Sequence, residues 1–154
     1  MTHGPQIYID ADACPVKDEA AKVAARHSLM ITYVSNSHMR LPIGENVKRM
    51  VVMAGADAAD DWIVEHVARN DIVVTADIPL AARAHKKGAR VISNVGKSFT
   101  EDSIGMALAM RDLMTHLRET TEMRGSNKVF APMDRSQFLQ ELEKVIQLAK
   151  RSVL

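Results

Sequence analysis

Two aspartates one residue apart follow the first apolar segment of the chain. Residues 7–9 read Ile-Tyr-Ile, and Asp10, Asp12 and Pro15 come after them. The apolar residues predict a short buried strand, and a proline fits the first turn of a following helix because no backbone N–H is needed there. Asp10 and Asp12 are therefore expected at the carboxyl end of a strand, where open α/β sheets bind ligands. Their like charges require a cation, a proton or water to offset the repulsion.

Further aspartates occupy comparable places along the chain. Asp77 follows the apolar run 72–74 and precedes Pro79, and Asp60 and Asp61 lie near the start of a helix expected from residue 55. Because the carboxyl ends of parallel strands share one edge of a sheet, we expect these carboxylates to converge with Asp10 and Asp12. Oxygen ligands suit hard cations such as Mg²⁺ or Mn²⁺. The predicted catalytic set is Asp10, Asp12, Asp60, Asp61 and Asp77, and the predicted metal ligands are Asp10, Asp12, Asp61 and Asp77.

Metals held in this way could act on a phosphodiester. One ion would polarise a water molecule towards hydroxide, and one would stabilise the leaving oxygen. Weaker candidates for substrate contacts are Lys17, Asn36, Thr75 and Lys97, and Arg40, Lys48 and Arg111 are further cations. Thr75 could instead simply end its strand, and Asp57 is interpreted as a helix cap with Asp60 three residues later, not as a ligand.

Strand and helix patterns alternate over the first two thirds of the chain. Helices are predicted over residues 15–27, 55–69 and 80–87, and strands over 29–34, 47–53, 71–75 and 90–93, the third of the chain's strands (47–53) being near a sheet edge. This order predicts an α/β fold with a mainly parallel central sheet. Helices follow over 99–122 and from Asp134, which is expected to cap the last one. We therefore expect one domain over 1–154, with residues from about 97 forming a helical extension packed on it or across a partner subunit.

Composition restricts the classes of function. The chain of 154 residues has a net charge of +1, so nucleic acid would have to bind at a local patch, and its 4% aromatic content disfavours base-stacking platforms. The single cysteine, Cys14, excludes an internal disulfide, is interpreted as a small buried residue, and fits a reducing cytoplasm. The polar N-terminus suggests no signal peptide, and no apolar run is long enough to span a membrane. A homodimer is compatible with the sequence.

Three blocks of the sequence resemble the signature blocks of the bacterial YaiI/YqxD family, which is grouped with the PIN-like fold. They are residues 10–16 (DADACPV), 55–63 (GADAADDWI) and 75–81 (TADIPLA). The resemblance implies a PIN-like three-layer α/β/α sandwich and, by superfamily analogy, a metal-dependent nuclease centre. It matches Asp10, Asp77 and one or both of Asp60 and Asp61 to the acidic pattern of PIN nucleases. Asp134-Arg135 and Phe138 also match the family, whereas Ser126-Asn127-Lys128 replace its glycine-rich segment.

Three functions remain open from the sequence. The first is a Mg²⁺- or Mn²⁺-dependent nuclease, acting on RNA in preference to DNA. The second is a phosphatase of the haloacid-dehalogenase type with Asp10 as nucleophile, since Asp-x-Asp after the first strand also opens that superfamily. The order of the later acidic residues fits this second function less well. The third is a non-catalytic module that binds nucleic acid or protein on a nuclease-like scaffold.

Overall fold

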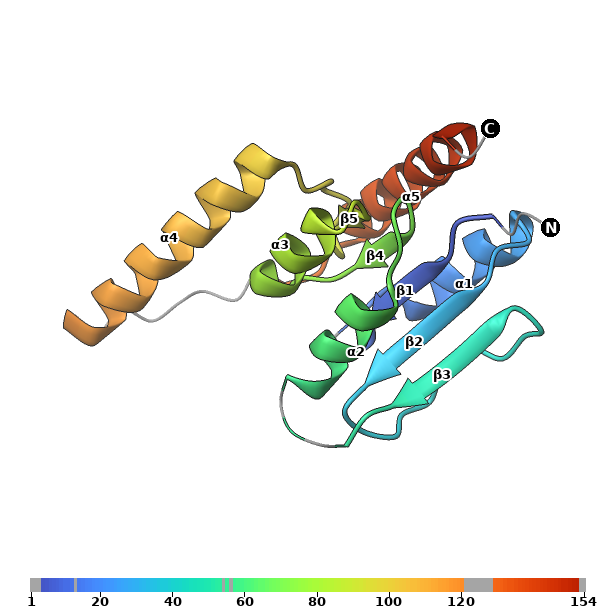
Figure 1. Ribbon diagram of the computed structural model, residues 1–154, viewed down its shortest axis with the longest axis horizontal. Helices are drawn as coiled ribbons and strands as arrows, with labels where there is room; N and C mark the ends of the chain where they lie inside the picture. The colour runs from blue at the N-terminus through green and yellow to red at the C-terminus, as the bar shows by residue number, and fades with distance from the viewer. Residues whose placement is uncertain (1–3, 13, 54, 56, 121–128, 153–154) are drawn as a thin grey trace.

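The computed structural model describes residues 4–12, 14–53, 55, 57–120 and 129–152. Its centre is a five-stranded parallel sheet with the order β3-β2-β1-β4-β5 (Figure 1). The register places Ile7 of β1 opposite Ile31 of β2 and Ile72 of β4. The predicted parallel α/β sheet is therefore confirmed. The strands are β1 (Ile7–Asp10), β2 (Ile31–Ser35), β3 (Val47–Val51), β4 (Ile72–Val74) and β5 (Arg90–Ile92).

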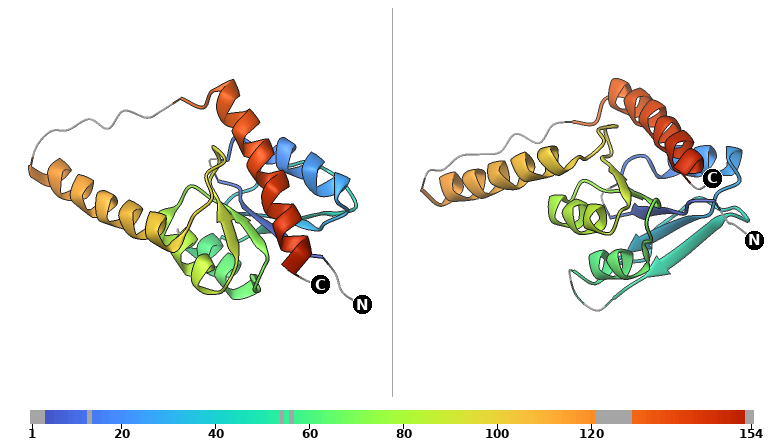
Figure 2. Two further views of the ribbon diagram at one scale, coloured as in Figure 1. Left: turned by 90° about the horizontal axis from the view of Figure 1, so that it is seen from above. Right: turned by 45° about the horizontal axis from the view of Figure 1, so that its top comes forward.

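Side chains alternate between the two faces of the sheet and give each face its own apolar core. Ile7 and Ile9 point into the core beneath α1 (Lys17–Arg26) and α5 (Pro132–Ser152). Tyr8 points to the opposite face, into the core beneath α2 (Ala58–His66) and α3 (Ile78–Lys86). This period of two is what an extended chain buried on both faces requires. Figure 2 shows the resulting three layers, with helices on both sides of the sheet.

The chain reverses its direction of travel across the sheet between β3 and β4. It runs from the central strand β1 outwards to β2 and β3, and returns to place β4 on the other side of β1. The loops that leave β1 and β4 therefore diverge to opposite sides, which opens a crevice at the carboxyl ends of these two strands. The expected convergence of Asp10 and Asp77 depended on their strands being neighbours, and this condition is met because β1 and β4 pair directly.

The two C-terminal helices differ in how they contact the sheet. α5 packs along α1 and contacts β4 and β5, with Phe138, Leu142 and Ile146 fully buried. α4 (Glu101–Thr120) packs on α3 through buried Ile104 and then extends away from the sandwich (Figure 1). The predicted end of this helix at residue 122 and the segment 126–128 lie outside the described residues.

Most helix boundaries differ from the sequence prediction by one to three residues, and the start of α5 and the end of α2 show the differences best. α5 begins at Pro132, so Asp134 lies inside its first turn and is not its cap. The Asp134 carboxylate instead accepts the backbone N–H of Ala131 at 2.9 Å, the reciprocal contact that an acidic residue makes three positions into a helix. α2 ends at His66, earlier than expected. Within the described part of the chain, no helix has both the length and the apolar composition needed to cross a bilayer.

Candidate functional site

A cavity of about 410 Å³ lies where the β1 and β4 loops diverge, and we call it the acidic cavity. Five of its lining side chains are carboxylates, contributed by three separate segments: the end of β1 with the loop after it, the start of α2 and the loop after β4. Two asparagines complete its polar lining. The lining residues are Asp10, Asp12, Asn36, Asp57, Ala59, Asp60, Ala76, Asp77 and Asn94. Counting Asp57, five aspartates of the chain therefore face one space, as the topology of a parallel sheet allows.

Thr75 joins the two central strands at the base of the acidic cavity. Its hydroxyl Oγ1 donates to Asp10 Oδ2 at 2.8 Å and accepts the backbone N–H of Asp77 at 2.9 Å. The side chain of Thr75 is fully buried. It fixes the Asp10 carboxylate relative to the loop after β4, so its position is that of a residue that orients the site.

Asp12 and Asp77 are each held by a backbone amide. The N–H of Asn36 donates to Asp12 Oδ2 at 2.9 Å, which ties the loop after β1 to the end of β2. Asp77 is the N-cap of α3, and its Oδ1 accepts the N–H of Leu80 at 2.9 Å, with Pro79 in the first turn. Each bond restrains a carboxylate that also lines the acidic cavity.

Asp57 and Asp60 face the acidic cavity from the start of α2. Asp57 occupies the N-cap position that the sequence predicts, but its side chain makes no capping hydrogen bond. The pKa of Asp60 is raised to about 6, mainly by burial and then by the charges of Asp77, Asp10 and Asp57, while Arg83 lowers it. The site therefore holds an acid that titrates near neutral pH.

The pKa of Asp10 is also raised. Burial is the main cause, the hydrogen bond from Thr75 opposes it, and the charges of Asp77 and Asp12 add to it. Burial therefore disfavours the ionised forms of Asp10 and Asp60 in this fold, and repulsion from the neighbouring carboxylates adds to this effect. A bound cation would relieve that repulsion.

Three predicted residues lie outside the acidic cavity. Asp61 is on the neighbouring position of α2, where its half-exposed carboxylate pairs with Arg83 at 2.9 Å. Lys97 is exposed in the turn after β5, where its backbone N–H donates to Ser93 Oγ. Lys17 donates from its ammonium group to the carbonyl of Cys14 and lines a different cavity. The structure does not bring these side chains to the three segments that contribute the carboxylates of the acidic cavity.

Asn94 is a lining residue that the sequence reasoning missed. It lies two residues beyond β5, and its side-chain oxygen is buried without a hydrogen-bond partner in the described part of the chain. The turn that carries Asn94 is pressed against α5, since a Cβ on Gly96 would lie 2.5 Å from the backbone of Gln137, and Gly96 has a φ of +81°. The signal was a polar residue directly after a strand, the same signal that identified Asp77.

The carboxylates of the acidic cavity are potential ligands for a metal ion. Among the residues that the structure describes, no three His, Cys, Asp or Glu side chains lie close enough together to enclose an ion. A cage made entirely of protein ligands therefore does not fit this arrangement. Mg²⁺ fits it better, because Mg²⁺ usually keeps several water molecules and uses only one or two carboxylates. The orphaned oxygen of Asn94 adds an acceptor that such a hydrated ion could satisfy.

Comparisons with known proteins identify relatives of the whole chain. Residues 8–148 match the model of a family described as "Uncharacterized BCR, YaiI/YqxD family". The UPF0178 protein mlr0875 of Mesorhizobium japonicum is 57% identical over 96% of each chain. The UPF0178 protein Rru_A0086 of Rhodospirillum rubrum is 56% identical over 95% of this chain and 98% of its own. The UPF0178 protein Atu1478 of Agrobacterium fabrum is 54% identical over 98% of this chain and 99% of its own. No solved structure matches the chain.

Proposed function

We propose that this chain, which belongs to the YaiI/YqxD family, is a nuclease that hydrolyses phosphodiester bonds with Mg²⁺ or Mn²⁺ in the acidic cavity. RNA is the expected substrate and DNA the alternative. The observation that carries the proposal is the meeting of Asp10, Asp12, Asp60 and Asp77 around one cavity at the point where the sheet reverses direction. Membership of the PIN-like superfamily remains part of the proposal.

Each side chain of the acidic cavity has a role in this proposal. Asp10 and Asp77, aligned by Thr75, would bind a hydrated cation, and Asp12, held by the Asn36 amide, would accept hydrogen bonds from the water molecules of that cation. A divalent cation supplies Lewis-acid chemistry: it makes water more acidic and stabilises negative charge on phosphate oxygens. Asp60, with a pKa of about 6, is suited to accept a proton from the attacking water near neutral pH. The amides of Asn36 and Asn94 could donate to phosphate oxygens.

A phosphatase with Asp10 as covalent nucleophile is the second function carried over from the sequence. The Asp-x-Asp pattern at the end of β1 favours it. Among the described residues that line the acidic cavity, however, there is no lysine or arginine to balance a phosphorylated aspartate beside four other carboxylates. Capture of an aspartyl phosphate at Asp10 would establish this function in place of the nuclease.

The test of the nuclease proposal is cleavage of end-labelled RNA and DNA by the full chain in Mg²⁺, in Mn²⁺ and in chelator. We expect cleavage only with metal, and a loss of about 100-fold or more in Asp10→Asn. Asp112→Asn, an exposed aspartate on α4, is the matched control and should cleave like wild type. Intact substrates in both metals, together with no metal binding, would overturn the proposal and leave a non-catalytic module. Asp61 was predicted as a metal ligand but forms an ion pair with Arg83 in the structure. The cleavage rate of Asp61→Asn therefore tests separately whether Asp61 contributes to catalysis.

We also propose that two copies of the chain associate through α4. Met106, Met110 and Leu113 are each more than half exposed and follow one another at the spacing of a coiled-coil seam. They lie on the side of α4 opposite to Ile104 and Leu108, which face α3. Light scattering should give twice the chain mass for wild type. Met110→Glu should halve the measured mass, whereas the control Met133→Glu on α5 should leave it unchanged. A monomeric wild type would refute the dimer.

The compartment that we propose for the protein is a reducing cytoplasm, which fits the free and buried Cys14.

A further inference from the structure

A second cavity, of about 650 Å³, lies beside the acidic cavity, and we call it the basic cavity. Both cavities are walled by the same two loops. From the loop after β1, Asp12 lines the acidic cavity, and Cys14 and Pro15 line the basic cavity. From the loop after β2, Asn36 lines the acidic cavity and Arg40 lines the basic cavity. Asp12 and Cys14 are only two residues apart, at most about 7 Å along the chain. The linings of the two cavities therefore come within this distance of each other at the loop after β1, a spacing within the reach of one extended ligand.

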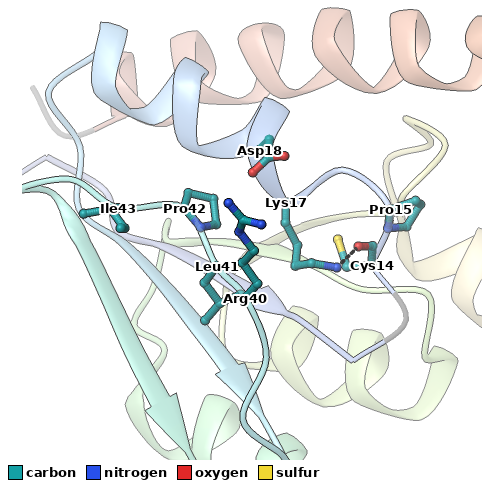
Figure 3. Close-up of a pocket in the computed structure, with 8 residues that line it drawn as sticks. All are labelled: Cys14, Pro15, Lys17, Asp18, Arg40, Leu41, Pro42 and Ile43. Carbon is teal, nitrogen blue, oxygen red and sulfur yellow. Dashed lines mark hydrogen bonds between the residues drawn. The ribbon is translucent and has the colours of Figure 1, made fainter.

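Two cations face the basic cavity from different elements (Figure 3). Arg40 comes from the loop after β2, and Lys17 comes from the first residue of α1. Within the described residues the Arg40 guanidinium has no hydrogen bond or ion pair, whereas the Lys17 ammonium is engaged with the carbonyl of Cys14. An unpaired guanidinium presents a planar fork of donors, the geometry that binds phosphate bidentately.

The remaining lining of the basic cavity favours a nucleotide over a simple ion. Asp18 contributes one carboxylate, so the cavity has a net charge of +1 and would hold one phosphate weakly. Leu41, Pro42 and Ile43 form an apolar wall, and the side chain of Ile43 is 98% exposed. A sugar or base next to the bound phosphate would cover this apolar wall.

We infer that the basic cavity binds a phosphate of a nucleic-acid strand whose scissile phosphate lies in the acidic cavity. The identity of the strand rests on the proposed function. The inference specifies the substrate class: a single strand with at least one phosphate beyond the bond that is cleaved, in preference to a mononucleotide. Arg40 is the main phosphate contact, and Lys17 is a lesser one because its ammonium already donates to a carbonyl.

Binding without hydrolysis tests the inference independently of catalysis. Fluorescence anisotropy of a labelled short RNA would be measured with the full chain in chelator. We expect Arg40→Ala to weaken binding about fivefold and to reduce the salt slope by about 0.7, the value for one phosphate contact on a single strand. Asp18→Asn should strengthen binding about twofold, since it removes the opposing charge. Arg111→Ala, an exposed cation on α4, is the control and should bind like wild type.

Each outcome of the binding experiment has a separate meaning. Equal losses in Arg40→Ala and Arg111→Ala would show diffuse attraction and overturn the inference. Inorganic phosphate that binds wild type as tightly as the RNA does, and binds Arg40→Ala less tightly, would reassign the cavity to small anions and also overturn it. RNA binding that depends on Arg40, without cleavage in any metal, would remove the proposed nuclease and leave the basic cavity as a nucleic-acid site.

If the chain cleaves RNA, kinetics add a second test. Arg40→Ala should raise KM about fivefold for an oligonucleotide and leave KM unchanged for a dinucleotide, which has only its scissile phosphate. Because Arg40 lies outside the acidic cavity, kcat should stay within about twofold of wild type. An equal rise in KM for both substrates would contradict the assignment of a second phosphate.

Discussion

Replacing Asp60 by asparagine should stabilise the metal-free protein at neutral pH. The fold raises the pKa of Asp60 from the ordinary 3.8 to about 6, so the ionised form is less favourable in the folded chain than in the unfolded chain. A change of that size corresponds to at most about 3 kcal/mol. Asp60 remains partly exposed, and the N-terminus of α2 favours its charge, so solvent screening and the helix dipole reduce the expected gain to about 1 kcal/mol.

The pH dependence gives this prediction a sign that can be checked. Because the folded pKa is raised, protonated Asp60 carries no penalty below about pH 4, and the penalty grows as the pH rises through 6. Asp60→Asn should therefore match wild type near pH 4 and melt about 2–4 °C higher above pH 7. Thermal melts in chelator, with both proteins compared at each pH, isolate this one group.

Asp61→Asn is the matched control for the stability prediction. It makes the same substitution one position away on α2, but it removes the partner of Arg83 and not a repelled charge. Its melting temperature should stay the same or fall slightly, since an exposed ion pair contributes less than about 1 kcal/mol. A stability gain in Asp61→Asn as large as that in Asp60→Asn, or no gain in Asp60→Asn at neutral pH, would refute the idea that the carboxylates of the acidic cavity repel one another.

Three further predictions follow from the same geometry. Addition of Mg²⁺ should raise the melting temperature of wild type at neutral pH more than that of Asp10→Asn, which has lost a charge facing the ion; equal shifts in the two proteins would place the ion elsewhere. Asp77→Asn should keep the stability of α3, since asparagine can also cap a helix, but should lose metal binding. Asp77→Ala should lose metal binding and also about 1 kcal/mol of unfolding free energy, because the cap is missing. Denaturant titration measures the stability, and calorimetry measures the metal binding. Gly96→Ala should destabilise the protein by more than about 1 kcal/mol in the same titration, because the new Cβ would meet the backbone of Gln137 at a positive φ; an unchanged midpoint would show that the turn can move.

The sequence predicted the sheet well because its strands are short apolar runs bounded by clear helix signals. The runs ending at Asp10 and at Thr75 each contain a buried strand followed by a helix. Pro79 lies in the first turn of α3 as predicted, whereas Pro15 lies before α1, which begins at Lys17. The pairing of β1 with β4 was a conditional expectation, since sequence patterns give the order of strands along the chain and not their order across the sheet. That order depends on which crossovers bury the most apolar surface.

Side-chain partners were less predictable than elements. Asp60 and Asp61 are adjacent and chemically identical in the sequence, yet one faces the acidic cavity and the other pairs with Arg83. A rotation of about 100° per residue on α2 separates them, and the phase of that rotation is decided by the packing of Ile63 and Ala59 on the sheet. Asn94 was missed because its position depends on how the turn after β5 packs against α5, a contact between segments far apart in the chain.

The aspartates of the acidic cavity combine structural hydrogen bonds with a negative charge that those bonds do not require. Asp77 caps α3 with one oxygen, but asparagine or serine would cap the helix about as well without a charge. Asp12 accepts a backbone N–H that a neutral side chain could also satisfy. Hydrogen bonding therefore accounts for polar residues at these positions and not for carboxylates. Burial, and after it the neighbouring charges, raise the pKa values of Asp10 and Asp60, so the ionised carboxylates oppose folding at neutral pH. A cluster that costs stability in the isolated chain is best explained by a cation that offsets its charge, and the metal-dependent difference between wild type and Asp10→Asn measures that compensation directly.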